Sequence, residues 1–592
     1  MTSPRRRALL TTASIAVALA AADTYVVVLA LTDMMAGVGL GIDALQQATP
    51  IISGFLLGYV AVLPLIGRIS DLVARQRVLL WCLTVFVAGS AITALAHDLP
   101  TLVTGRVVQG VGGGGLVPAT LAIVGELWPP ERRGVPLGVV GAVQELGSVL
   151  GPVLGALVLT IADWRMIFWL NAALGTALAV SVLLASRRLS SDLAGGPAPG
   201  RQSIDSARPG AEGATRSRWR RRTLPRLGAG LLWVAAAAVT ALALAAPEDL
   251  RTSVEYGAPF VPVGESNARV LTPIGLTGLA LLAVAAVTAT YRARPLLRRA
   301  DLPGALLLGG AVGCVILTFA AAEPEKEVVG PLGYTLLPVA VLLVVGYVLH
   351  QRRATNPVVP RETITGRTTI ALLVSFLVGV ALVAVVVDIP VLARLVHTDS
   401  QVSAALVLLR FLVAVPVGAL AGGILVRRLG DGLVTAIGLS VGAIALGVMA
   451  TWGAGSLAGV GSYVVLVALG LGIGLTLAPI NNTVLARTAR DLHGTASALV
   501  VVSRMVGMVV GLALLTGIGL NAYYREVAAL PDPTDTDALV GAGLVQVHAV
   551  FVGAAVAAAL GAVLALAMGI RRGAGSGDEK VTSSPTVISS PL

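Results

Sequence analysis

Long apolar runs separated by short polar connections dominate the chain. Most runs are about 20 residues long, the length at which a helix crosses a bilayer, whereas the strands of an outer-membrane barrel are shorter and alternate. The pattern therefore predicts an all-α polytopic membrane protein. We expect about sixteen spans, with boundaries good to a few residues, at residues 8–31, 49–67, 78–97, 101–125, 135–161, 166–186, 227–246, 272–291, 302–322, 334–350, 367–391, 402–426, 432–452, 461–485, 495–519 and 546–570.

The polar connections divide these spans into larger units. Residues 504–511 echo residues 145–151, which suggests two similar halves with a central site between them, as in many transporters. We expect the inserted spans to be peripheral to the two halves. In chain order the predicted segments are an N-terminal six-helix bundle (1–189), a flexible cytoplasmic linker rich in Gly, Pro, Ser and Arg (190–226), an inserted four-helix segment (227–353), a C-terminal six-helix bundle (366–572) and a disordered cytoplasmic tail (573–592).

Composition and charge agree with a membrane protein. Hydrophobic residues make up 56% of the chain and charged residues only 12%. The net charge of +11 comes mainly from arginines in alternate short connections, a pattern of membrane orientation rather than of nucleic-acid binding. With both termini cytoplasmic, every inner connection is arginine-rich. We therefore expect a multi-pass protein of the bacterial inner membrane, surrounded by membrane lipids. Cys82 and Cys314 lie inside apolar runs and indicate neither a disulfide framework nor a metal site.

Two charges lie at matching depths in spans of opposite halves. Glu145 and Arg504 are each roughly 15 Å from the cytoplasmic start of their spans. Charge at that depth is expensive and usually marks a coupling site or an ion pair. An ion pair between them would offset the cost of burying either charge alone. We predict a latch between the halves that is closed in one state and open in another.

Two further pairs are predicted in the outer half of the membrane. Asp23 and Arg106 lie in the same bundle, and a carboxylate beside an arginine can load and release a proton as its surroundings change. Asp388 and Arg410 form a looser candidate pair in the second half. The alternative for each pair is a static structural bridge.

The connection between the second and third spans indicates a conformational lock rather than a binding site. Gly67 and Asp71 are four residues apart, on one helical face. Asp71 could cap or bridge to a neighbouring helix end, while Arg75 and Arg77 hold the connection at the lipid headgroups. Such contacts would favour one conformation over another.

The span that carries Glu145 also has a face of small residues. Gly147, Gly151 and Gly155 are four residues apart, so another backbone can approach closely along that face. Pro152 removes one backbone donor and favours a kink. Helix packing alone explains these glycines, but it does not explain Glu145.

Together these motifs resemble the major facilitator superfamily. Gly67, Asp71, Arg75 and Arg77 match its loop motif, with Ala74 in place of the usual glycine. The other similarities are the fourth-helix motif Arg-x-x-Gln-Gly at Arg106, Gln109 and Gly110, the fifth-helix antiporter motif at Gly147, Gly151, Pro152 and Gly155, the first-helix pair Asp23-Thr24, and the Trp-Arg-x-x-Phe-x-x-Asn sequence at residues 164–171. The second-half copy of the loop motif has Arg427 where the aspartate would be, so any lock there must differ.

The resemblance is to the drug:proton antiporters with fourteen helices, and within that group to mycobacterial exporters implicated in extruding triacylglyceride and drugs with a periplasmic lipoprotein. It implies the superfamily fold of two six-helix bundles. It also implies that Arg106 and Gln109 take part in proton coupling and that the fifth-helix motif serves export. No cofactor besides a proton gradient is implied.

The sequence thus predicts a proton-coupled exporter that works by alternating access. Its substrate would be hydrophobic or amphipathic, a lipid such as triacylglyceride or a drug, with a periplasmic lipoprotein as a possible partner. The alternatives are an antiporter of drugs alone and a non-transporting membrane scaffold or sensor, although a scaffold does not need intramembrane charges. An enzyme is not expected, because the sequence lacks a nucleophile–base constellation, a metal-ligand cluster and an ATP-binding motif.

Overall fold

The computed structural model describes a helical membrane protein, and no β-strand occurs among the described residues. These are residues 4–40, 45–195, 230–246, 257–263, 269–320, 333–360, 363–364, 366–398, 401–453, 455–532 and 535–569. The expected linker lies outside them except for residues 190–195, which continue α6, and the expected tail at 573–592 lies outside them entirely.

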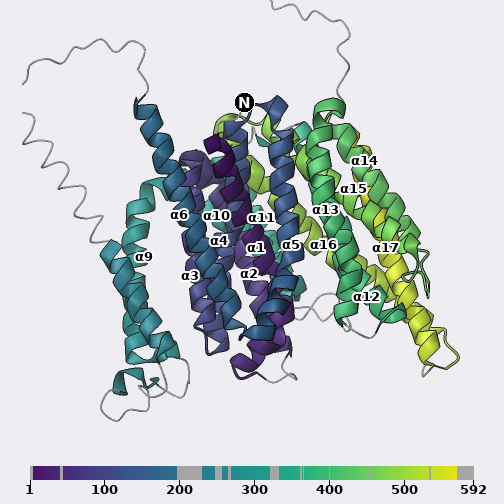
Figure 1. Ribbon diagram of the computed structural model, residues 1–592, viewed down its shortest axis with the longest axis horizontal. Helices are drawn as coiled ribbons and strands as arrows, with labels where there is room; N and C mark the ends of the chain where they lie inside the picture. The colour runs from purple at the N-terminus through teal and green to yellow at the C-terminus, as the bar shows by residue number, and fades with distance from the viewer. Residues whose placement is uncertain are drawn as a thin grey trace, which may run out of the picture.

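Two groups of six helices form the body of the molecule (Figure 1). The N-terminal half contains α1 (Pro4–Gly37), α2 (Leu45–Leu72), α3 (Arg75–Ala94), α4 (Leu99–Leu127), α5 (Gly134–Ile161) and α6 (Arg165–Gly195). The C-terminal half contains α12 (Arg367–Val396), α13 (Gln401–Leu429), α14 (Asp431–Met449), α15 (Val460–Arg487), α16 (His493–Ala528) and α17 (Thr536–Leu566).

Every expected span coincides with a helix, which confirms the all-α polytopic class. Within the described residues, 14 helices are long and apolar enough to cross a membrane. Two shorter apolar helices, Gly230–Ala245 and Leu302–Thr318, lie where the seventh and ninth spans are expected.

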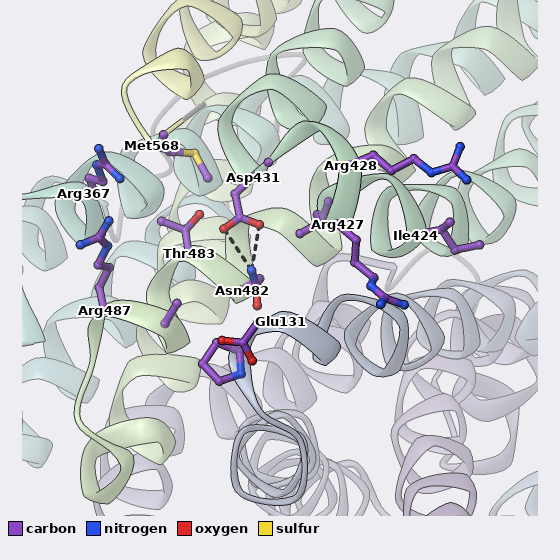
Figure 2. A pocket seen from close by; sticks show the side chains of 15 residues that line it. Glu131, Arg367, Ile424, Arg427, Arg428, Asp431, Asn482, Thr483, Arg487 and Met568 are labelled. Carbon is purple, nitrogen blue, oxygen red and sulfur yellow. Dashed lines mark hydrogen bonds between the residues drawn. The ribbon is translucent and has the colours of Figure 1, made fainter. Parts of the chain in front are cut away.

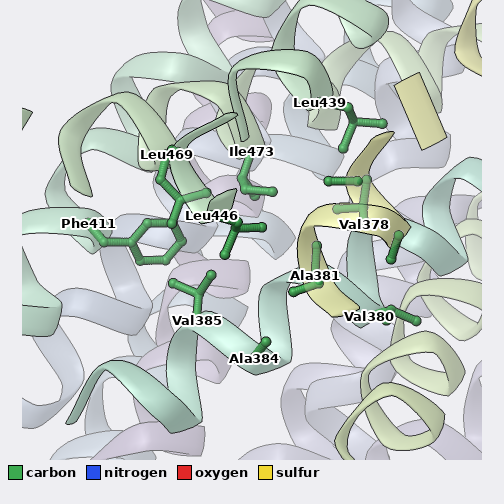
Figure 3. Packing of buried hydrophobic residues seen from close by; sticks show 14 of the residues in the cluster. Val378, Val380, Ala381, Ala384, Val385, Phe411, Leu439, Leu446, Leu469 and Ile473 are labelled. Carbon is green, nitrogen blue, oxygen red and sulfur yellow. The ribbon is translucent and has the colours of Figure 1, made fainter. Parts of the chain in front are cut away.

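The two halves repeat one packing plan. In the N-terminal half α4 packs on α2 and α3, and α1 packs on α5. In the C-terminal half α15 packs on α13 and α14, and α12 packs on α16. Figure 3 shows buried apolar side chains of α12, α13, α14 and α15 packed together in the core of this half. Small residues make these approaches close. Gly147 and Gly151 of α5 lie against the backbone of Ala18 and Ala22 in α1, and Gly507 of α16 lies against the backbone of Phe376 in α12. Thus α5 and α16 occupy equivalent places.

The inserted helices are α9 (Pro273–Arg299), α10 (Leu302–Ala320) and α11 (Gly333–Arg353), besides Gly230–Ala245. Figure 1 shows α9 at the edge of the molecule, where it makes few contacts with the two halves. Contrary to expectation, α10 is not peripheral: it packs on α2 of one half and on α16 of the other. Gly309 permits this approach because it lies against the backbone of Ala61.

The halves meet at one end of the molecule, which we call the arginine end and define by the helix ends at Leu72, Leu127, Leu429 and Arg487. Between α5 and α13, Gly134 and Gly423 lie backbone to backbone. Between α2 and α16, Gly67 lies against Gly494 and Ala498. Hydrogen bonds of Asp71, Arg75 and Arg133 join the two halves at this end.

Candidate functional site

Asp23 of α1 is the centre of a buried polar network in the N-terminal half. Its Oδ2 forms an ion pair of 2.6 Å with Nη1 of Arg106 in α4. Its Oδ1 accepts hydrogen bonds from Nε2 of Gln109 at 2.9 Å and from Nδ2 of Asn171 at 2.6 Å. Both Asp23 and Arg106 are 1% exposed. Asp23 and Arg106, which were predicted to pair from their depth in the membrane, are therefore in contact in the structure.

Arg106 is held from several sides by its own contacts. Nη1 also donates to Oε1 of Gln109 at 2.7 Å, and Nε donates to the carbonyl oxygen of Ile51 in α2 at 3.2 Å. The guanidinium carbon lies 4.5 Å from the ring centroid of Phe55 and 5.6 Å from that of Phe168. Aromatic faces attract a guanidinium, most strongly where water is excluded. These contacts position the cation, with Nε and Nη1 both hydrogen-bonded.

A buried carboxylate that is hydrogen-bonded on both oxygens and paired with one arginine is well compensated for its loss of water. The arrangement can change with a single proton: a neutral Asp23 would no longer attract Arg106. Because the partners come from α1, α4 and α6, such a change would alter the contacts of three helices. This is chemistry suited to moving a proton rather than to bond making or breaking.

Two members of the network, Asn171 and Ser90, received no role from the sequence. Asn171 had a signal, because it is the last residue of the Trp-Arg-x-x-Phe-x-x-Asn sequence that also supplies Phe168. Ser90 of α3 had none; its hydroxyl accepts from Nε2 of Gln109 at 2.9 Å and donates to the carbonyl oxygen of Phe86. The sequence alone does not show whether a serine in an apolar helix faces lipid or a neighbouring helix.

Glu145 and Arg504 do not form the predicted ion pair in this structure. They lie near enough to interact electrostatically, with Tyr25 and Tyr59 close to both. No salt bridge within 4.0 Å joins them in the described part of the chain. Arg504 instead borders a cavity of about 20 Å³ between the halves, which Gln144 and Asn481 also line. That volume holds about one water molecule.

Asp388 and Arg410 are not brought together, contrary to expectation. Nη1 of Arg410 donates to the carbonyl oxygen of Leu457 at 3.2 Å and to Oγ of Ser462 at 3.0 Å, and its guanidinium lies 3.7 Å from the ring centroid of Tyr463. Arg410 therefore faces the start of α15. Asp388 is buried in α12 and makes no hydrogen bond through its side chain with any described residue.

At the arginine end, Asp71 caps a helix of the opposite half. Its carboxylate accepts hydrogen bonds from the backbone nitrogen of Gly494 at 2.6 Å and from the backbone nitrogen and hydroxyl of Thr495 at 2.9 and 2.6 Å. These are the first backbone donors of α16, which have no partner inside the helix, and a negative charge there is favourable.

Arg75 strengthens the same contact. Nη1 pairs with Oε2 of Glu126 at 2.9 Å, and Nη2 donates to the carbonyl oxygen of Arg490 at 2.5 Å. Gly67 lets α2 approach α16, because a Cβ atom there would lie 2.6 Å from that of Ala498. Arg77, by contrast, is exposed and donates no side-chain hydrogen bond within the ranges given above. The structure thus joins three of the four predicted lock residues.

Arg133 is a further link between the halves that sequence reasoning had taken only as loop charge. It is 2% exposed and donates from Nε to Trp128 and from Nη2 to Gly125, both carbonyl oxygens at 2.8 Å. Nη1 reaches the carbonyl oxygen of Leu485 in the C-terminal half at 3.2 Å. Burial lowers the pKa of the Arg133 guanidinium, but an arginine remains charged in proteins.

The remaining candidate residues lie on the α1–α5 contact. Gly147, Gly151 and Gly155 face Ala18, Ala22 and Val26, and Pro152 lies inside α5. No group of three or more potential metal ligands occurs in the part of the chain that the structure describes.

Two six-helix halves, a buried charge network in one of them and a tightly joined end define a polytopic membrane transporter. The sequence matches the Major Facilitator Superfamily over residues 13–351 and 302–512. The chain therefore belongs to this superfamily and is a transporter rather than an enzyme.

Curated relatives cover most of the chain. It is 33% identical to a triacylglyceride transporter of Mycolicibacterium hassiacum over 87% of this chain and 81% of that protein. It is 31% identical to one of Mycobacteroides abscessus over 88% and 84%. It is also 30% identical to a triacylglyceride transporter of Mycobacterium tuberculosis over 96% and 95%.

Solved structures show the same fold. A human organic anion transporter superposes with a TM-score of 0.55 at 14% identity, covering 95% of this chain and 100% of that one. A proton:xylose symporter bound to a bromodeoxyglucose superposes with a TM-score of 0.52 at 12% identity, covering 95% of each. At such identities the likeness concerns the fold alone.

Proposed function

We propose that this transporter is a proton-coupled exporter of hydrophobic or amphipathic compounds, triacylglyceride among them, that works by alternating access. The observation that carries the proposal is the Asp23 network. It places one carboxylate, paired with one arginine and hydrogen-bonded by two amides, in the buried interior of a membrane protein. Residues of this kind mark ion and proton pathways.

The coupling step would begin with a proton on Asp23. Loss of the negative charge would leave Arg106 with its contacts to Gln109 and Ile51 and would loosen α1 from α4. Because α1 packs on α5, and α5 packs on α13, a shift of α1 would be passed to the boundary between the halves. Two packed arrangements of these helices would then correspond to two access states.

The arginine end would face the cytoplasm. Arg68, Arg132, Arg353, Arg427 and Arg487 all lie in its connections or at its helix ends, and cytoplasmic connections are the ones enriched in arginine. With this orientation the joined halves close the cytoplasmic side. The contacts of Asp71, Arg75 and Arg133 would then be the lock of the outward-facing state, and both termini would be cytoplasmic.

Glu145 and Arg504 would form the complementary contact. They lie at similar depths on the equivalent helices α5 and α16, near each other but without a salt bridge in this structure. A small approach of the two helices would form an ion pair between the halves. A latch of this kind would exchange with the lock at Asp71 during the transport cycle.

The names of the curated relatives point to a lipid substrate, and all three are called triacylglyceride transporters. The exposed side chains of α5 fit a hydrophobic molecule: Leu146, Leu150, Val153 and Leu157 form an uncovered apolar face. A triacylglyceride released on the outer side would need an acceptor, and a lipid-binding periplasmic lipoprotein would supply one.

The test is transport by the purified protein in liposomes with an imposed proton gradient. A labelled triacylglyceride and a cationic dye are followed in parallel, with acceptor vesicles present for the lipid. We expect gradient-dependent movement of the triacylglyceride, abolished by a protonophore. Movement of the dye alone would indicate a drug antiporter. If neither the lipid nor the dye moves, with acceptor vesicles present and the protein correctly inserted, the result would favour a non-transporting membrane scaffold or sensor.

A further inference from the structure

A wide cleft of about 860 Å³ opens at the arginine end of the C-terminal half, away from the Asp23 network (Figure 2). Its walls come from the first turn of α12, the last turns of α13 and α15, the first residue of α14 and the end of α17. Pro130 and Glu131 of the other half complete it.

The lining of the cleft is strongly basic. Four arginines line it, namely Arg367, Arg427, Arg428 and Arg487, against two carboxylates, Asp431 and Glu131, which leaves a formal charge of +2. All four arginines are exposed. Figure 2 shows Arg367 and Arg487 on one side of Asp431 and Arg427 and Arg428 on the other. Like charges that face one cleft repel one another and favour an anion between them.

The acidic residue at the centre of the cleft, Asp431, is hydrogen-bonded to an asparagine that also lines the cleft. Both oxygens of Asp431 accept from Nδ2 of Asn482, at 2.9 and 3.0 Å, and Arg487 acts on Asp431 only at longer range. Within the described residues, Arg367, Arg428 and Arg487 make no hydrogen bond or ion pair. Their guanidinium donors can therefore reach a ligand.

Membrane orientation explains why arginines lie at this end, but not why four of them surround one cleft. The arginines come from three helices that are distant in sequence, α12, α13 and α15. Arginine is suited to phosphate because its planar fork donates two parallel hydrogen bonds. The departure of the second-half loop motif, Arg427 in place of aspartate, adds a positive charge at this place.

An apolar path leads into the cleft along α13. Val413, Val417, Leu420 and Ile424 recur at helical spacing and are 39 to 57% exposed. Ile424, the last of them, also lines the cleft. A ligand with a phosphate group and an acyl chain could place the former among the arginines and the latter along this stripe.

We propose that this cleft is a binding site for a phosphate-bearing anion, and that the headgroup of an anionic phospholipid is its occupant. Clusters of arginine beside membrane helices are suited to such headgroups. The arginines all belong to the C-terminal half, and Pro130 and Glu131 complete the wall of the cleft only while the arginine end is joined. None of its lining residues belongs to the Asp23 network, and the existence of the site does not depend on the proposed export.

Binding is measured by native mass spectrometry of the full-length protein in detergent. The probes are dioleoyl phosphatidylglycerol, dioleoyl phosphatidylcholine with the same chains, and inorganic phosphate. The test variant is Arg367→Gln with Arg487→Gln. Arg428→Gln is a second, single variant, in case the double one does not fold. The matched control is Arg525→Gln, an exposed arginine on α16 at the opposite end.

We expect wild type and Arg525→Gln to bind phosphatidylglycerol in preference to phosphatidylcholine, and the double variant to bind it about tenfold more weakly. Arg428→Gln should weaken it in the same direction. Inorganic phosphate that competes at comparable concentration would support the phosphate site and assign it to a soluble anion. Equal binding of the two lipids, or unchanged binding of phosphatidylglycerol by folded variants, would overturn the proposal.

Discussion

At the scale of single residues, the buried carboxylates differ in how their charge is compensated. Asp23 accepts hydrogen bonds from three side chains, one of them a cation. Glu145 has a cation nearby but not in contact, and Asp388 has no hydrogen-bonding partner among the described residues. We propose that Asp23 is the coupling carboxylate and that Glu145 belongs to a latch that is open in this state.

The latch can be tested by exchanging its charges. Glu145→Arg and Arg504→Glu should each lower transport strongly, because each leaves two like charges close together inside the membrane. Combined, they restore an opposite pair and should recover part of the lost rate, measured as lipid or dye movement in liposomes. Strong loss in both single variants without recovery in the double one would count against a direct pair.

The sequence predicts which charged residues lie at the same depth in the membrane, and it predicts pairs only where equal depth is sufficient to bring them together. A rise of about 1.5 Å per residue gives the level of a charge in its helix, and this placed Asp23 beside Arg106. Depth does not give the face of the helix. The pairing of Asp388 with Arg410 was wrong because Arg410 lies on a face of its helix that is directed to Ser462. Ser90 and Arg133 were missed because their contacts with Gln109 and Leu485 are set by the packing of one helix against another.

At the scale of helices, the α1–α5 contact depends on small residues. A Cβ atom at Gly151 would meet the backbone of Ala22, only one residue from Asp23. Gly151→Ala should therefore lower the free energy of unfolding by about 1–3 kcal/mol, the usual cost of overpacking, and reduce transport. Thermal unfolding in detergent measures the first effect.

Gly447→Ala is the matched control, because nothing lies within 4 Å of a Cβ atom at that helical glycine of α14. It should be neutral, or stabilising by up to about 1 kcal/mol, since alanine favours the helix. Equal destabilisation by the two substitutions would show that the glycine contact with α1 is unimportant.

The lock between α2 and α16 gives a second prediction at this scale. Asp71→Asn removes the charge at the first turn of α16 and should weaken the joined state by about 1 kcal/mol. Spin labels at Ala74→Cys and Ala489→Cys, on opposite halves and with Cys82 and Cys314 replaced by serine, would report the separation of the arginine end. We expect a population at longer distance in Asp71→Asn.

Asp535→Asn serves as the comparison for this measurement, because Asp535 caps α17 within its own half. Its label distances should match those of the wild type. A distance distribution that Asp71→Asn leaves unaltered would remove Asp71 from the lock.

The positions of the helices were largely predictable, because apolar runs of membrane length leave few alternatives. Which helices pack against one another was less predictable. The equivalence of α5 and α16 followed from the echo between residues 145–151 and 504–511, and the structure has these helices in equivalent packing. The packing of α10 on both halves was not predicted, because the sequence of a uniformly apolar helix does not indicate which face packs against other helices.

At the scale of the whole molecule, three features lie at different levels. The Asp23 network is buried inside the N-terminal half, Glu145 and Arg504 lie between the halves, and the contacts of Asp71, Arg75 and Arg133 join the arginine end. Their order suggests a sequence of events: a proton alters the first, the second closes and the third opens. In this sequence of events, the proton acts at Asp23.

The most direct test is gradient-driven transport by Asp23→Asn in liposomes, beside the wild type and Asp388→Asn. Asparagine keeps the shape of the side chain and cannot exchange a proton. We predict that Asp23→Asn inserts and folds normally but gains no rate from an imposed proton gradient, whereas Asp388→Asn keeps most of the response. A gradient response in Asp23→Asn equal to that of the wild type would show that Asp23 does not carry the coupling proton.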